Sequence, residues 1–252
     1  MMHLCNFLKK IKIHPLTYFY FIISFITGYW KYYCSAYIIV CIHELCHYLM
    51  AYSFHFEIEK IELLPFGAYL FLNDYGLKPK INELCVVLAG LSCHFFIYMI
   101  LRRITSILFV DYLLKINELV FVFNLLPIYP MDGYRLLLIL LQNSFDMQKA
   151  CYASFKISIF FLCFLYVRCR YLNNYIIFLY LVYQNFLYYR YIPTQIRNYY
   201  LNIPFSYKNK KIKIHEKIKY IRDAHNYYKI NNEIYDEEMM KNELIKSIKR
   251  VN

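Results

Sequence analysis

Long apolar segments separated by short polar ones make up most of this 252-residue chain. A helix needs about 20 consecutive apolar residues to cross the hydrocarbon core of a bilayer, and segments of about this length recur along the sequence. The pattern predicts an α-helical polytopic membrane protein with six transmembrane helices. The predicted spans are roughly residues 15–32, 34–54, 81–101, 105–128, 151–168 and 172–189.

The segment between the second and third predicted spans has a different pattern. Over residues 55–76, which begin HFEIEKIEL, apolar and charged positions nearly alternate. Alternation of this kind is typical of a half-buried strand. The segment is too short and too charged to span, so we expect a membrane-associated, strand-like loop.

The C-terminal part of the chain has a third character. Its composition predicts a short strand over 211–215, a helix over 216–229 and a second helix over 236–251. We therefore divide the chain into a membrane domain, residues 1–190, and a small soluble α/β appendage, residues 191–252.

Composition and charge agree with a membrane protein. Hydrophobic residues make up 60% of the chain, against about 45–50% in an ordinary soluble domain. Of the net charge of +12, residues 190–252 carry +7, from 14 basic and 7 acidic side chains. An excess of Lys and Arg is typical of cytoplasmic segments, so we interpret this region as a cytoplasmic tail and expect no direct nucleic-acid partner. The nine cysteines show no disulfide framework, and we expect free thiols.

Three ionisable side chains interrupt the second predicted span. His43, Glu44 and His47 form the motif HExxH, and ionisable groups are costly at bilayer depth. On a helix, positions i and i+4 share one face, so the two imidazoles can bind one Zn²⁺. The glutamate is placed to accept a proton from a metal-activated water. The alternative is a pair of core histidines hydrogen-bonded to neighbouring helices.

A third metal ligand is predicted at the end of the fourth apolar segment. Asp132 follows Pro127 and Pro130, which break the helix, and precedes Gly133, which permits a sharp turn. A broken helix can carry a carboxylate into a membrane bundle, although a plain helix-stop turn is the alternative. Asn124, nearby, can position a substrate or donate a hydrogen bond between helices.

These motifs together resemble the site-2 protease family of intramembrane zinc metalloproteases, most nearly its sporulation branch. The similar stretches are HELCH at 43–47, LLPFGAY at 63–69, VVLAGLSCHFF at 86–96 and FNLLPIYPMDGYR at 123–135. The resemblance covers about residues 10–190. Cys46 stands where the family tends to have glycine.

The resemblance implies a site and a biological role. His43, His47 and Asp132 would bind one Zn²⁺, Glu44 would be the general base, and Asn124 would hold the substrate backbone. The implied reaction removes the pro-sequence of a membrane-associated sporulation sigma factor precursor, under control of inhibitory membrane partner proteins. The implied location is the membrane surrounding the forespore, with the site facing the mother-cell cytoplasm.

The resemblance also implies a C-terminal CBS domain, which senses nucleotide. The predicted tail has no strand pair between its two helices, so we interpret it as a reduced or degenerate CBS-like region. We therefore expect no nucleotide pocket of the CBS type.

Three other functions are compatible with the same residues. A membrane zinc-binding or transport protein would use the ligands without requiring Glu44. An inactive relative would bind substrates without cutting them. Another class of membrane HExxH enzyme would take a glutamate as third ligand, for which Glu83 and Glu118 are the nearby residues.

Overall fold

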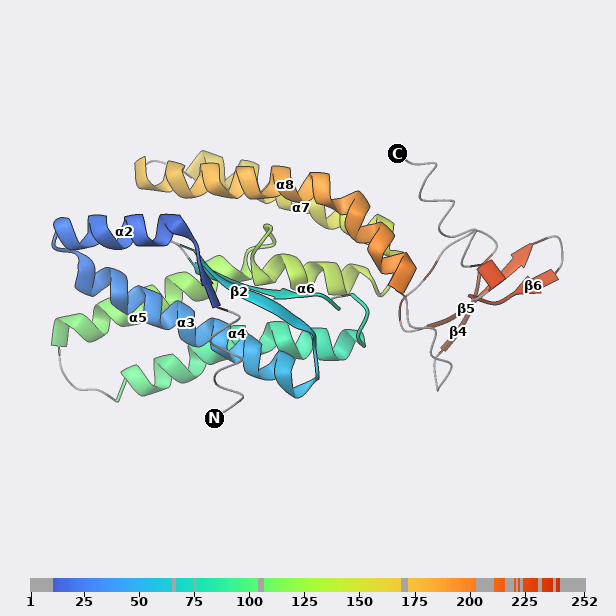
Figure 1. Ribbon diagram of the computed structural model, residues 1–252, viewed down its shortest axis with the longest axis horizontal. Helices are drawn as coiled ribbons and strands as arrows, with labels where there is room; N and C mark the ends of the chain where they lie inside the picture. The colour runs from blue at the N-terminus through green and yellow to red at the C-terminus, as the bar shows by residue number, and fades with distance from the viewer. Residues whose placement is uncertain are drawn as a thin grey trace. The chain divides into compact units, whose positions relative to one another are not determined.

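Helices dominate the computed structural model, and two small sheets accompany them (Figure 1). The chain divides into two compact units, Met1–Asn124 and Leu125–Asn252, which we describe separately. The structure describes residues 11–64, 67–74, 76–103, 107–168, 172–202, 211–215, 220, 222, 224–230, 233–237 and 239–240.

The first unit combines helices with a three-stranded sheet. Its elements are β1 (Ile11–Ile13), α2 (Pro15–Ile26), α3 (Trp30–Ser53), β2 (Ile58–Leu64), β3 (Gly67–Leu72), α4 (Lys80–Leu101) and α5 (Ile107–Leu125). The second unit contains α6 (Asp132–Leu141), α7 (Met147–Arg168), α8 (Leu172–Asn202), β4 (Lys211–His215), β5 (Ala224–Ile230) and β6 (Glu233–Tyr235).

The predicted spans correspond to helices. Among the described residues, three helices are long and apolar enough to cross a membrane: α3, α4 and Met147–Val167 of α7. The first and fourth predicted spans contain α2 and α5, and the sixth lies within the longer helix α8, so the number six stays a prediction. The first predicted span ends early, because α2 stops at Ile26 and Gly28 adopts a left-handed conformation (φ 77°) before α3 begins.

The strand-like prediction for 55–76 is confirmed. Strands β2 and β3 pair antiparallel, and β1 adds to β2 in parallel, with Ile11 opposite Ile61. The sequence did not indicate β1, since three residues are too short for a recognisable alternation. The sheet order β1-β2-β3 leaves β1 and β3 as the edges.

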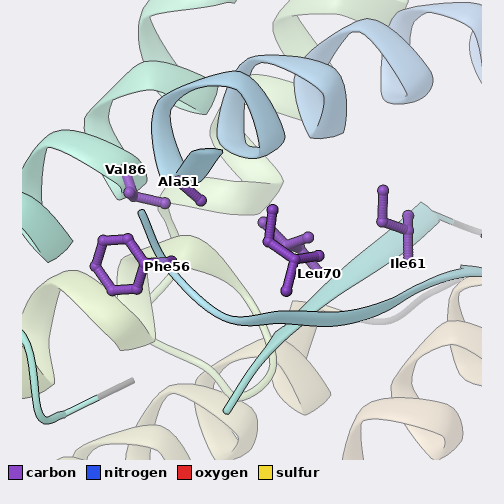
Figure 2. Close-up of a cluster of buried hydrophobic side chains, with 6 residues drawn as sticks. Ala51, Phe56, Ile61, Leu70 and Val86 are labelled. Atoms are coloured by element: carbon purple, nitrogen blue, oxygen red, sulfur yellow. The ribbon is translucent and has the colours of Figure 1, made fainter. Parts of the chain in front are cut away.

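A compact apolar cluster joins this sheet to the helices of the first unit. Figure 2 shows Ala51 of α3, Val86 of α4, and Phe56, Ile61 and Leu70 within this cluster. Ile58 belongs to it as well. A register shift between Ile58 and Lys60 lets Ile58 and Ile61, three positions apart, both be buried, as expected where a bulge interrupts the pleat.

The tail departs from its prediction. The strand over 211–215 is confirmed, but the predicted helix over 216–229 is wrong, because β5 occupies 224–230. Ala224, Asn226 and Tyr228 are buried, with less buried residues between them, which is the two-residue period of a strand.

The tail strands also form a sheet. β4 pairs parallel with β5, and β5 pairs antiparallel with β6. The strand pair that we expected to be missing is therefore present, and our reason for expecting no nucleotide pocket fails. Most of the second predicted helix, 236–251, lies outside the described residues.

Truncation of the sheet core should destabilise the protein. Leu70 is only 1% exposed, so we expect Leu70→Ala to cost about 2–5 kcal/mol through lost burial and a residual cavity. Thermal unfolding in detergent, monitored by circular dichroism, measures this loss. Leu119→Ala is the control, since Leu119 is 65% exposed. Equal losses in both variants would contradict a structural role for the cluster.

Candidate metal centre

The two histidines of the HExxH motif face each other inside the first unit. His43 and His47 lie one turn apart on α3, both are buried, and their Nε2 atoms are 3.0 Å apart. Two nitrogens bound tetrahedrally to one zinc ion would be about 3.3 Å apart. The observed spacing is close to that of two ligands of a shared ion.

The other ring nitrogens are held by the neighbouring helix. His43 Nδ1 lies 3.0 Å from the carbonyl oxygen of Gly90, and His47 Nδ1 lies 2.7 Å from that of Val86. A carbonyl only accepts, so each Nδ1 carries the proton and each neutral ring has its lone pair on Nε2. Two lone pairs facing each other favour a cation between them. The residues therefore fit a zinc ion, with α4 selecting the tautomers.

Close approach of α3 and α4 depends on Gly90. A Cβ atom at this position would lie 2.2 Å from both Cε1 and Nε2 of the His47 ring. No residue with a side chain fits there unless the ring moves. Our site prediction missed Gly90, although its signal was a glycine within the apolar run VVLAGL.

Glu44 lies with the two histidines. Potential ligand atoms of His43, Glu44 and His47 all lie within 4.8 Å of one another, and so do those of His43, Cys93 and His94. These are the two such groups in the described part of the chain. Cys46 belongs to neither group. His94 and Cys93 were not predicted as site residues.

The two alternative acidic ligands have other surroundings. Glu83 is buried, and its Oε1 accepts a 2.6 Å hydrogen bond from the backbone N–H of Gly76. Glu118 is exposed on α5. Within the described residues, neither joins a metal-capable group with His43 and His47.

Asn124 belongs to the first unit and Asp132 to the second. Asn124, near the C-terminal end of α5, donates from Nδ2 to the carbonyl of Val120 at 3.0 Å. Asp132 is buried in the first turn of α6, and its Oδ1 lies 4.0 Å from Nη1 of Arg135. The roles of both residues stay predictions.

The segment before Asp132 is held by buried polar groups. Tyr129 N–H donates to Ser158 Oγ at 3.2 Å, Ser158 donates to Asn185 Oδ1 at 2.6 Å, and Asn185 Nδ2 donates to Tyr129 O at 2.9 Å. A Cβ on Gly133 would lie 2.2 Å from the carbonyl oxygen of Leu125. The turn that begins α6 is thus fixed by α7, α8 and a required glycine.

Comparisons with known proteins give a consistent result, although no protein-family model matches the chain. The chain is 32% identical to stage IV sporulation protein FB of Bacillus subtilis over 182 residues, which are 69% of this chain and 59% of that protein. It is 32% identical to a zinc metalloprotease of Methanocaldococcus jannaschii over 119 residues, 44% of this chain and 34% of that protein. The chain thus spans less than two thirds of either relative.

A solved structure shares the fold. The site-2 protease from Methanocaldococcus jannaschii superposes with a TM-score of 0.57 at 23% identity, covering 69% of this chain and 88% of that one.

Adding a methyl group at Gly90 should disturb the histidine pair. We expect Gly90→Ala to displace the His47 ring and weaken zinc binding by about tenfold or more. Zinc affinity would be measured by competition with a chromophoric chelator in detergent. Ser92→Ala, at an exposed position of the same helix, is the control. Equal affinities in the two variants would show that the close approach does not matter for the site.

Proposed function

We propose that this chain belongs to the site-2 protease family and is an intramembrane zinc metalloprotease performing regulated proteolysis, a proposal that its similarity to stage IV sporulation protein FB supports. One observation carries the proposal: the Nε2 atoms of His43 and His47 face each other at 3.0 Å, with Glu44 in the same group. Ionisable side chains within a membrane helix are costly, and they usually mark a functional site.

His43, His47 and Asp132 would hold one zinc ion in this proposal. A catalytic zinc site takes three protein ligands and keeps one position open, and Asp132 offers a buried carboxylate. When bound, zinc supplies Lewis-acid activation of water and of the substrate carbonyl.

Glu44 would move the proton. It accepts a proton from the attacking water as the water oxygen bonds to the peptide carbon, and it passes that proton to the amine nitrogen as the C–N bond breaks. Asn124 would hold the substrate backbone through its amide. An extended substrate segment would add as a further strand beside an edge of the β1-β2-β3 sheet, the recognition mode known as β-strand addition.

The substrate that we propose is the precursor of a sporulation sigma factor, cleaved to remove its pro-sequence. Support comes from the sporulation protein among the relatives and from the resemblance in the sequence motifs. The same reasoning proposes inhibitory membrane partners, and a multi-pass location in the membrane surrounding the forespore with the site facing the mother-cell cytoplasm. The basic tail suits the cytoplasmic side.

Removal of the proposed base should separate metal binding from catalysis. We expect Glu44→Gln to retain zinc, because both histidines remain, and to cut a membrane-associated substrate about 10²- to 10⁴-fold more slowly. Zinc content and cleavage rate are measured on the same preparation. Near wild-type cleavage would refute the protease mechanism, and a zinc transporter would be insensitive to this change.

The third ligand can be tested with a matched pair of aspartates. We expect Asp132→Asn to weaken zinc binding about tenfold or more, since a neutral amide replaces a charged ligand. Asp111→Asn, at an exposed position of α5, should bind zinc as the wild type does. Identical zinc affinity in wild type and Asp132→Asn would place the third ligand elsewhere.

A further inference from the structure

A buried polar chain leads away from the histidine pair on the side opposite His47. His94 of α4 lies with its Nε2 3.0 Å from His43 Nδ1, and its own Nδ1 lies 2.8 Å from Oδ1 of Asn117 on α5. His43, His94 and Asn117 are all buried. These hydrogen bonds connect α3, α4 and α5. His94 and Asn117 were not among the predicted site residues.

We propose that His94 and Asn117 are positioning residues that fix the tautomer and orientation of His43, so that its Nε2 is held ready for the metal. This inference rests on the proposed zinc site. It adds two residues that would touch neither the metal nor the substrate.

The direction of each hydrogen bond follows from the amide of Asn117. Its Nδ2 donates to the backbone carbonyl of His94 at 2.9 Å, so Oδ1 is the atom that faces the ring of His94. An amide oxygen only accepts, so His94 Nδ1 carries a proton. In the neutral ring, His94 Nε2 then has a lone pair.

That lone pair selects the state of His43. A lone pair on His94 Nε2 accepts a hydrogen from His43 Nδ1, which leaves the His43 lone pair on Nε2, facing His47. The Nδ1 hydrogen of His43 is shared between His94 Nε2 and the Gly90 carbonyl, each at 3.0 Å. His47 Nδ1 lies 2.7 Å from the carbonyl oxygen of Val86.

The same side chains suggest one competing arrangement. His43, Cys93 and His94 also have potential ligand atoms within 4.8 Å of one another, which would suit a second metal ion. In that arrangement His43 Nδ1 would be a metal ligand and would carry no hydrogen for His94 to accept. The two arrangements therefore differ in the number of ions bound and in the ligand set.

The test uses the full-length protein in detergent and compares four variants. His94→Leu and Asn117→Leu interrupt the series of hydrogen bonds from Asn117 through His94 to His43. Asn117→Asp retains an acceptor oxygen for His94 Nδ1. Gln142→Leu is the control for loss of a buried amide, since the described partners of Gln142 are Met147 and Arg222 in the second unit. The readouts are zinc affinity by chelator competition, zinc stoichiometry, and the visible absorption of the cobalt-substituted protein.

We expect His94→Leu and Asn117→Leu to weaken zinc binding about 10- to 100-fold, the usual effect of losing an outer partner of a ligating histidine. Asn117→Asp and Gln142→Leu should stay within about threefold of wild type. At saturating cobalt, the absorption bands should keep their positions in all variants, because the ligands themselves are unchanged. If His94→Leu does not fold, the contrast between Asn117→Leu and Asn117→Asp carries the test.

Three results would overturn the inference. Unchanged zinc affinity in Asn117→Leu would show that the hydrogen bonds through His94 do not position His43. Two zinc ions per wild-type chain, with one lost in His94→Leu, or cobalt bands that shift in that variant, would make His94 a ligand instead. Failure of the wild type to bind zinc would remove the proposed function together with this inference, whereas tight zinc binding and cleavage in both leucine variants would remove this inference alone.

Discussion

The structure of the first unit depends on the contact between α3 and α4, in which two backbone carbonyls of α4 receive the Nδ1 hydrogens of His43 and His47. An unpaired buried polar group is costly, and at bilayer depth the cost rises. The carbonyls of Val86 and Gly90 accept the Nδ1 hydrogens of the two rings. The lone pairs of the two imidazoles are then on their Nε2 atoms, which face each other. Packing and chemistry therefore impose the same requirement, a glycine at position 90.

The sheet supports this contact from one side. Its apolar residues pack with Ala51 of α3 and Val86 of α4, the second of which also supplies the carbonyl that receives the His47 hydrogen. The bulge in β2 lets Ile58 and Ile61 both be buried in the cluster. A site held by packed elements keeps its ligands in place better than one built on loops.

Buried polar groups also hold the elements of the second unit in place. The turn before Asp132 is held by Ser158 and Asn185, so α6 begins at a fixed place. At the other end of α6, Gln142 accepts a buried 2.9 Å hydrogen bond from Arg222, just before β5. Helix α6 is thus bound to α7 and α8 at its start and to the tail at its end.

The sequence by itself determined the features that depend on local spacing: the helical spans, the strands after His55, and the pairing of His43 with His47 one turn apart. Only the tertiary structure decided which groups complete them, since Gly90 lies 47 positions from His43 and Asn117 lies 23 from His94. Period and propensity act within a few residues, whereas these contacts depend on how α3, α4 and α5 pack. Strands β1 and β6 escaped prediction for a related reason, because a strand of three residues is stabilised by its pairing partner more than by its own pattern. Strand β5 does carry a two-residue burial period, which the predicted helix over 216–229 did not take into account.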